Sequence, residues 1–129
     1  MAGQSKKILI IEDDKFLAKM ISRTLESHNY EIILAGSGKE GLVKASGSDV
    51  DLILLDIMLP DIDGFDLLET IKGDEKTKKI PVVIISNLGQ PEDIQRGRTL
   101  GAKDYLVKSD LSLDEVVKKV QKYLPPAQT

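Results

Sequence analysis

Three carboxylates in this sequence are placed where they could act together. Glu12 and Asp13 follow the apolar segment 7–11, and Asp56 follows the apolar segment 51–55. If both segments are strands of one parallel sheet, their carboxyl ends share the edge where such sheets bind ligands, and the three acids converge. Carboxylates this close repel one another unless protons or a cation compensate, and an all-oxygen set without His or Cys suits Mg²⁺. Each acid alone is better explained as a strand end or a helix cap, but the set is not.

A hydroxyl and an ammonium group extend this set. Ser86 ends the apolar segment 81–85, and Lys108 ends the segment 104–107. Mg²⁺, the Lys108 ammonium and the Ser86 hydroxyl could each take one oxygen of a phosphoryl group. Asp56 would then be the nucleophile and would form an aspartyl phosphate. Taken singly, the two residues read as a loop hydroxyl and a solvated strand end, and only their joint position favours a phosphoryl site.

The elements that must position these residues follow from the apolar pattern. Short runs rich in β-branched residues predict five strands, at 7–11, 31–35, 51–55, 81–85 and 104–107. The longest gaps between them carry helical periodicity, so the sequence predicts an α/β fold of the (βα)₅ type, a parallel sheet with helices on both faces. Three strands, at 7–11, 51–55 and 81–85, are apolar on both faces and therefore central, whereas 104–107 is predicted at an edge.

Local signals also mark the helices. The first helix is predicted to bury one apolar stripe, made of Phe16, Leu17, Met20, Ile21 and Leu25. Ser37 and Ser112 each precede a Glu by three residues, the spacing of a capping box, and Gly64 and Pro91 open the two remaining helices. The helix after Pro91 has few apolar residues and an interior glycine, Gly97, which costs about 1 kcal/mol relative to alanine. We therefore expect this fourth helix to be weakly held and able to change its packing.

Composition narrows the class of protein. The 129 residues suit one domain, and a net charge of −3 argues against a nucleic-acid binder that works by bulk electrostatics. With no cysteine, disulfide frameworks, thiolate nucleophiles and zinc–thiolate sites are excluded. No apolar run approaches the length that crosses a bilayer, and the start "MAGQSKK" is polar rather than a signal peptide, so we expect no membrane insertion and a cytoplasmic location.

Four stretches of sequence together resemble the response-regulator receiver domains of two-component signalling. They are "ILIIEDD" (8–14), "LLDIMLPDIDG" (54–64), "VVIIS" (82–86) and "GAKDYLVK" (101–108). The resemblance covers roughly residues 6–124, which leaves tails at 1–5, predicted to be disordered, and at 125–129. It implies a flavodoxin-like, doubly wound sheet of five parallel strands in the order 2-1-3-4-5.

The resemblance also implies roles for the site residues. Asp56 would be the phosphorylated residue, and Mg²⁺ would be bound by Asp13, Asp56 and the backbone carbonyl of Met58, with Glu12 acting mainly through water. Ser86 and Lys108 would bind the phosphoryl group. These roles are implied by the family and are not worked out from spacing.

Tyr105 would be the aromatic switch residue of the family, which turns inward on activation. A half-buried tyrosine on an edge strand, with its hydroxyl in water, fits the sequence equally well. The surface formed by the fourth helix, the fifth strand and the fifth helix would change on phosphorylation and control a downstream protein, and it is also a possible dimer interface. The phosphodonor would be a sensor histidine kinase or a phosphotransfer protein.

Several residues depart from the family pattern. Ser109 follows Lys108 where proline is usual, and a cis bond without proline costs about 3–4 kcal/mol, so we expect a trans bond and a locally shifted loop. Asn87 stands where the family prefers a small residue and would narrow phosphate access. Met58 and Leu88 flank the expected phosphate and are both apolar, so neither can orient a water, and we expect slow self-dephosphorylation. A Glu at position 12, where Asp is commoner, is a mild change.

Other classes of function fit the sequence less well. A Mg²⁺-dependent phosphatase or phosphotransferase with an aspartyl nucleophile would need a second Asp two residues later, where this chain has Met58. A nucleotide- or flavin-binding module would present amides and hydroxyls after the first strand, whereas "EDD" repels phosphate. The intact acid, hydroxyl and lysine set argues against a degenerate receiver that acts only as a binding surface. We therefore expect no enzymatic activity beyond the chain's own phosphorylation and dephosphorylation, and no direct DNA binding. No output domain is visible, so the chain is either a stand-alone regulator or a piece of a longer one.

Overall fold

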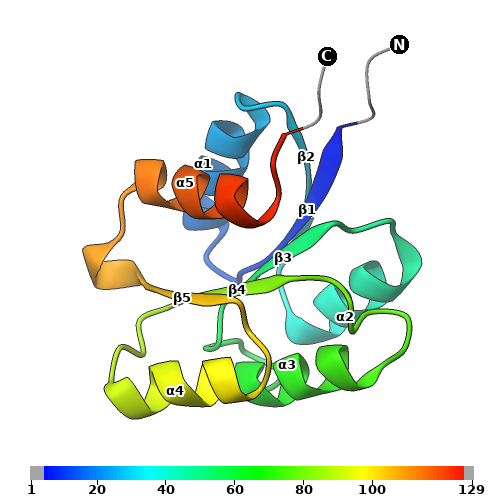
Figure 1. The fold of residues 1–129 in the computed structure, drawn as a ribbon, viewed down its shortest axis with the longest axis vertical. Helices are drawn as coiled ribbons and strands as arrows, with labels where there is room; N and C mark the ends of the chain where they lie inside the picture. The colour runs from blue at the N-terminus through cyan, green and yellow to red at the C-terminus, as the bar shows by residue number, and fades with distance from the viewer. Residues whose placement is uncertain (1–4, 127–129) are drawn as a thin grey trace.

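A single parallel sheet organises the molecule, which is a computed structural model that describes residues 5–126 (Figure 1). The sheet runs in the order β2-β1-β3-β4-β5, and every strand pair is parallel. Its strands are β1 (Lys6–Ile11), β2 (Tyr30–Ala35), β3 (Leu52–Leu55), β4 (Val82–Ser86) and β5 (Asp104–Val107). The predicted α/β class and strand order are confirmed. The proposed tails at 1–5 and 125–129 fall largely outside the described residues.

Helices cover both faces of the sheet (Figure 1). Two of them, α1 (Lys15–Glu26) and α5 (Leu113–Tyr123), pack on one face. The other face carries α2 (Gly38–Gly47), α3 (Gly64–Gly73) and α4 (Pro91–Thr99). A single 3₁₀ turn, Lys108–Asp110, follows β5. Within the described residues no helix is both long and apolar enough to pass through a bilayer.

The central strands are buried on both faces because helices lie on both sides of them. Ile8 and Ile10 of β1 face the α1/α5 layer, whereas Leu9 and Ile11 face the opposite layer. All four residues of β3 are buried, and so are all five of β4. Burying a Leu or Ile side chain stabilises the fold by about 1.5–3 kcal/mol. These buried strands therefore hold the side chains at their carboxyl ends firmly in position.

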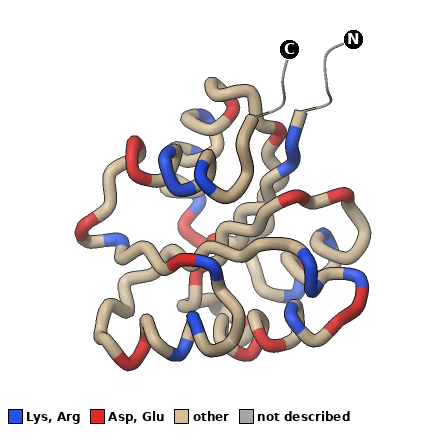
Figure 2. Tube along the Cα trace, in the orientation of Figure 1, with Lys and Arg blue, Asp and Glu red and all other residues tan. Residues whose placement is uncertain are grey.

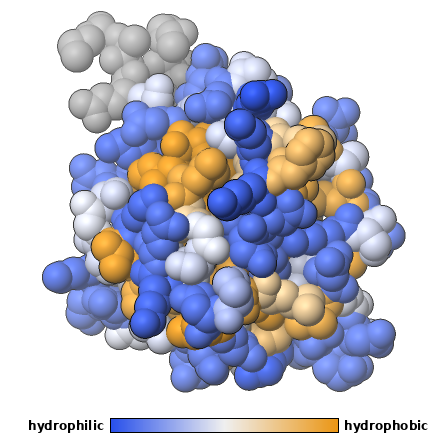
Figure 3. All heavy atoms as spheres, turned by 180° about the vertical axis from the view of Figure 1, so that it is seen from behind, coloured by the Kyte–Doolittle hydropathy of each residue, from blue (hydrophilic) through white to orange (hydrophobic). Residues whose placement is uncertain are grey.

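The predicted apolar stripe of α1 is wrong in part. Phe16 is 75% exposed and Met20 is 38% exposed. The residues that α1 buries are Ala18, Ile21, Ser22 and Leu25, at the i, i+3, i+4, i+7 spacing of one helical face. Ile21 and Leu25 are buried as predicted, whereas Phe16 and Met20 are exposed to solvent. Seen from behind, the surface carries apolar patches separated by hydrophilic side chains (Figure 3).

The predicted helix starts are confirmed, although neither predicted capping box is complete. The Ser37 hydroxyl accepts a hydrogen bond from the Glu40 backbone N–H at 3.2 Å, and Ser112 does the same for Glu115. The Glu40 side chain does not reach back to Ser37; its Oε1 accepts from the backbone N–H of Gly36 at 2.7 Å. Each hydrogen bond satisfies an amide that the helix or the preceding turn leaves free.

A close backbone approach explains the glycine that opens α3. A Cβ at Gly64 would lie 2.3 Å from the Ile57 Cα and 2.6 Å from its carbonyl oxygen. The Gly64 N–H donates to that same carbonyl at 2.9 Å. The loop after β3 therefore folds back tightly on the start of α3, and only glycine fits there.

This packing leads to a prediction about stability. Gly64→Ala should lower the free energy of unfolding by about 1–3 kcal/mol, because the added methyl group meets backbone that cannot move aside. Gly73→Ala is the matched control, since nothing lies within 4 Å of a Cβ at that position. The control should change stability by less than about 1 kcal/mol. Urea unfolding of both variants tests this, and equal effects would contradict it.

Candidate functional site

The three predicted acids meet at the carboxyl ends of β1 and β3. Ile11 and Leu55 are register partners, so the residues that follow them lie side by side. One carboxylate oxygen from each of Glu12, Asp13 and Asp56 lies within 4.8 Å of the others. The doubly wound topology has its strand-order reversal at this edge, and the cluster lies where such sheets bind ligands.

The three acids differ in their surroundings. Glu12 and Asp56 are only 5% and 4% exposed, whereas Asp13 is exposed. Both oxygens of Glu12 are already engaged: Oε1 lies 2.7 Å from the Lys108 Nζ, and Oε2 accepts the Asp14 backbone N–H at 3.1 Å. Asp13, the exposed member of the cluster, is therefore better placed than Glu12 to bind a cation directly.

Lys108 connects the two buried acids. Its Nζ lies 3.0 Å from the Asp56 Oδ2 as well as 2.7 Å from Glu12. The other Asp56 oxygen, Oδ1, accepts the Met58 backbone N–H at 3.0 Å. Burial disfavours the lysine's charge, but the hydrogen bonds to Glu12 and Asp56 outweigh it, so the pKa of Lys108 is raised. The ammonium group is therefore a fixed positive charge beside Asp56.

Burial also disfavours the charged form of Glu12, and here it is the largest cause of the pKa shift. Desolvation raises the pKa of Glu12 from 4.5 to about 7, with the Lys108 hydrogen bond opposing the shift and Asp56 adding to it. One ammonium group is thus too little positive charge for three neighbouring carboxylates. A hard divalent cation would supply the rest, and an all-oxygen donor set fits Mg²⁺.

Ser86 and Tyr105 both bond to the backbone of Leu88. The Ser86 side chain is fully buried at the end of β4, and its Oγ accepts the Leu88 N–H at 3.2 Å. The Tyr105 hydroxyl donates to the Leu88 carbonyl at 2.5 Å. The ring is buried, and burial raises the pKa of its hydroxyl. The alternative in which Tyr105 is half-buried with its hydroxyl in water is not what the structure shows.

The backbone of α4 lies so close to Tyr105 that residue 97 has no room for a side chain, which explains the glycine there. A Cβ there would lie 2.7 Å from the Ile84 Cδ1 and 3.0 Å from the Tyr105 Cδ2. Glycine is the only buried residue of α4, and Ile94 is half-buried beside it. A second contact comes from Arg96, whose guanidinium lies 4.4 Å above the centre of the Phe65 ring. The helix is thus held by few apolar contacts, as predicted.

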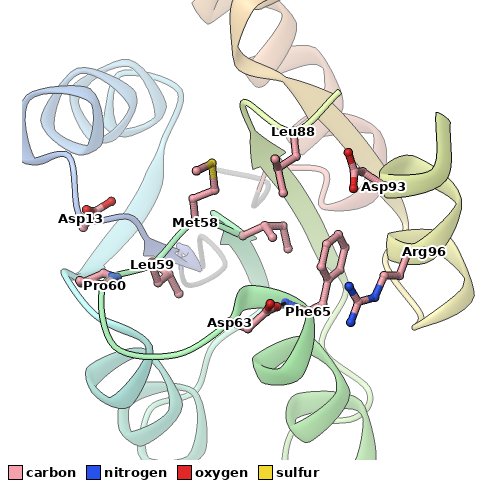
Figure 4. Close-up of a pocket in the computed structure, with 10 residues that line it drawn as sticks. Asp13, Met58, Leu59, Pro60, Asp63, Phe65, Leu88, Asp93 and Arg96 are labelled. Carbon is pink, nitrogen blue, oxygen red and sulfur yellow. Dashed lines mark hydrogen bonds between the residues drawn. The ribbon is translucent and has the colours of Figure 1, made fainter. Parts of the chain in front are cut away.

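A groove of about 480 Å³ opens beside the acids (Figure 4). Met58 and Leu88 line it from one side, and Phe65 and Arg96 line it from the other. Asp13 borders the same groove. Met58 is 54% exposed and Leu88 is partly buried, so both apolar side chains lie at the mouth of the groove.

The departures from the family pattern have clear structural outcomes. The Lys108–Ser109 peptide bond is trans, as predicted. The predicted shift of the following loop stays a prediction. Asn87 is exposed next to Ser86, which places it at the surface of the site.

Acidic and basic residues are interspersed along the trace of the described chain (Figure 2).

Sequence reasoning missed two long-range polar contacts. The Asp61 carboxylate accepts hydrogen bonds from the first amides of α2, 22 and 23 residues earlier in the chain. Asp104 is 7% exposed and lies 3.0 Å from both the Lys119 Nζ and the Tyr123 hydroxyl. Burial opposes ionisation of Asp104, yet these contacts outweigh it and its pKa is lowered. Neither contact leaves a local signal, because the partners are distant in sequence.

Comparisons with known proteins agree with this geometry. A family model described as "Response regulator receiver domain" matches residues 8–121. The chain is similar to the DNA-binding dual master transcriptional regulator RpaA of Synechocystis, with 38% identity over 118 residues that cover 92% of this chain and 48% of that protein. The chain spans about half the length of this relative and of the response regulator ArlR of Staphylococcus saprophyticus, which it also matches.

Solved structures give the same result. The chemotaxis response regulator CheY4 of Vibrio cholerae superposes with a TM-score of 0.85 at 29% identity, covering 92% of this chain and 98% of that one. A two-component response regulator from Clostridium difficile gives a TM-score of 0.86 at 32% identity, covering 92% and 95%.

The acid cluster predicts stabilisation by Mg²⁺. A cation that binds only the folded chain should add about 2.7 kcal/mol at a hundred times its Kd, and thermal unfolding with and without Mg²⁺ measures this. Asp13→Asn should abolish most of the gain, because it removes the exposed carboxylate of the cluster. Asp14→Asn is the control: Asp14 caps α1 through Phe16 and Leu17, and asparagine caps equally well. An equal loss in both variants would contradict the assignment.

Proposed function

The chain belongs to the response-regulator receiver domain family, and from that premise we propose that it is a phosphoacceptor switch. Asp56 receives a phosphoryl group from a sensor histidine kinase or a phosphotransfer protein. The observation that carries the proposal is the contact of the Lys108 ammonium with the buried Asp56 carboxylate, inside a cluster of three acids. Lys108 contacts two carboxylates of this cluster, Glu12 and Asp56, and Asp56 is the one at the position that the family phosphorylates.

The roles of the residues are those that the family implies, and the acid cluster supports them. Asp13, Asp56 and the backbone carbonyl of Met58 would hold Mg²⁺, which would supply positive charge to the phosphoryl oxygens. Glu12, which is buried and contacts Lys108 and the Asp14 amide, would act mainly through water. An Asp56 oxygen forms a bond to phosphorus while the bond from phosphorus to the donor imidazole breaks, and the imidazole nitrogen keeps the electron pair. Lys108 then shifts its contact from the carboxylate to a phosphoryl oxygen.

Signalling passes from the phosphoryl group to α4 through Leu88. When the Ser86 hydroxyl turns toward the phosphoryl group, its bond to the Leu88 N–H is lost. The Leu88 carbonyl is the partner of the Tyr105 hydroxyl, so movement of this residue changes the hydrogen bond of the tyrosine as well. The surface of α4, β5 and α5 changes in consequence and controls a downstream protein, and the same surface is a possible dimer interface.

The runner-up is a Mg²⁺-dependent phosphatase or phosphotransferase with Asp56 as nucleophile. Such an enzyme needs an acid/base group two residues after the nucleophile, and the side chain there is Met58, which is apolar and 54% exposed. We accordingly assign the chain no catalysis beyond its own phosphorylation and dephosphorylation. We place it in the cytoplasm, where the kinase domains that phosphorylate receivers operate, and we assign these residues no direct contact with DNA.

Phosphorylation is the direct test. Incubation with Mg²⁺ and a small acyl phosphate should add one phosphoryl group, visible by intact mass and labile to hydroxylamine as an acyl phosphate is. Asp56→Asn should remove it, and chelation of Mg²⁺ should slow it. Asp66→Asn, which changes an exposed acid of α3, should leave it intact. A phosphoryl group that persists in Asp56→Asn, or continuous turnover of free phosphomonoesters, would contradict the proposal.

The apolar groove mouth predicts a long-lived phosphoryl group. Met58 and Leu88 cannot orient an attacking water, so exchanging them together for Asn and Gln should speed loss of the phosphoryl group by about tenfold, the effect of one hydrogen bond that orients the water. The measurement is the decay of phosphorylated chain in the presence of Mg²⁺. Val43→Gln, at an exposed apolar position of α2, is the control. An unchanged decay in the double variant would refute the prediction.

A further inference from the structure

The loop after β3 is fixed at two places. At its base, the Met58 N–H bonds to Asp56, the Gly64 N–H bonds to the Ile57 carbonyl, and Met58 forms an antiparallel bridge with Asp63. Ile57 is also buried in the core, and Leu59 and Ile62 pack against it. None of these contacts is a hydrogen bond from the loop to α2.

At its tip, the loop is tied to α2 by one side chain. The Asp61 Oδ1 accepts the Gly38 N–H at 2.8 Å, and its Oδ2 accepts the Lys39 N–H at 2.9 Å. These are the first two amides of α2, which the helix itself leaves free. The positive end of the helix dipole favours the carboxylate, and the two amide bonds lower the pKa of Asp61. The tether is therefore charged at neutral pH.

Packing beneath the tether is equally close. A Cβ at Gly38 would lie 1.9 Å from the Ile62 Cγ2 and 3.3 Å from the Asp61 Oδ1. The absence of a side chain at position 38 lets the loop tip lie directly on the start of the helix. The hydrogen bonds and this contact act at the same point, where the β1–β2 half of the molecule meets the loop that follows β3.

We propose that Asp61 is a positioning residue for the Mg²⁺ site: by tying the loop to α2, it fixes the Met58 backbone carbonyl that serves as a metal ligand. The inference rests on the proposed function, which assigns that carbonyl to Mg²⁺. Asp61 lies three residues beyond Met58 and is absent from the acid cluster, so it acts through the loop and not as a ligand. Mg²⁺ demands nearly ideal octahedral geometry, so it is sensitive to small displacements of a backbone ligand.

The test compares Mg²⁺ binding in three variants by isothermal titration calorimetry. Asp61→Ala removes both acceptors and should weaken binding by about tenfold, the lower end of what loss of an outer-shell partner costs. Asp61→Asn keeps one acceptor and should have a smaller effect. Gly38→Ala disturbs the same contact from the helix side and should also weaken binding.

Ser37→Ala is the matched control. It removes the other N-terminal cap of α2, the hydrogen bond from the Glu40 N–H, but leaves the loop tether untouched. Its Mg²⁺ affinity should equal that of the wild type. The phosphorylation rate of Asp61→Ala should return to within about twofold of wild type at saturating Mg²⁺, because Asp61 contacts no reacting group.

Two results would overturn the inference. One is an unchanged Mg²⁺ affinity in Asp61→Ala, and the other is an equal loss in Ser37→Ala, which would trace the effect to the stability of α2. Failure of the proposed function looks different, because in that case the wild-type chain itself would bind no Mg²⁺ and accept no phosphoryl group.

Discussion

The mutual repulsion of three carboxylates at one sheet edge is the constraint on which the rest of this structure depends. Two of them, Glu12 and Asp56, are buried, where an uncompensated charge costs several kcal/mol. A single ammonium group, that of Lys108, lies between these two and within 3.0 Å of each. Such a cluster is stable only if the strands that carry it are held firmly, and it stays short of positive charge until a cation binds. An arrangement of this kind is suited to binding and releasing ligands, not to adding stability.

The buried apolar strands hold the three carboxylates in place. All four residues of β3 are buried between two helical layers, and the strand delivers Asp56 at its end. Its neighbours β1 and β4 are buried in the same way and deliver Glu12 and Ser86. Hydrophobic burial is not directional and by itself places no side chain. The parallel strands all end at the same edge of the sheet, so the residues that follow them are brought together there. The strand β3, which is buried throughout, therefore carries Asp56, the proposed site of phosphorylation.

The sheet and the acid cluster were predictable from sequence, because both arise from local patterns and a rule of topology. The same reasoning failed for Phe16 and Met20, since periodicity identifies a helical face but not how wide a stripe its partner covers. It also gave no hint of the Asp61 contact with α2, or of the reason for Gly97. Those features depend on which distant residue lies opposite, and the sequence contains no local signal for that. The chemistry of the site was thus easier to predict than the contacts that hold it in place.

One residue, Leu88, connects Ser86 at the site to Tyr105 on the fifth strand. The N–H of Leu88 bonds to Ser86 and its carbonyl accepts from Tyr105, so neither partner can move without affecting the other's bond. A typical hydrogen bond contributes about 1 kcal/mol to stability. The α4 helix that rests on Tyr105 buries only a glycine fully, so little apolar contact opposes its movement. This arrangement supports the proposal that an exchange of hydrogen bonds at the site changes how this helix packs.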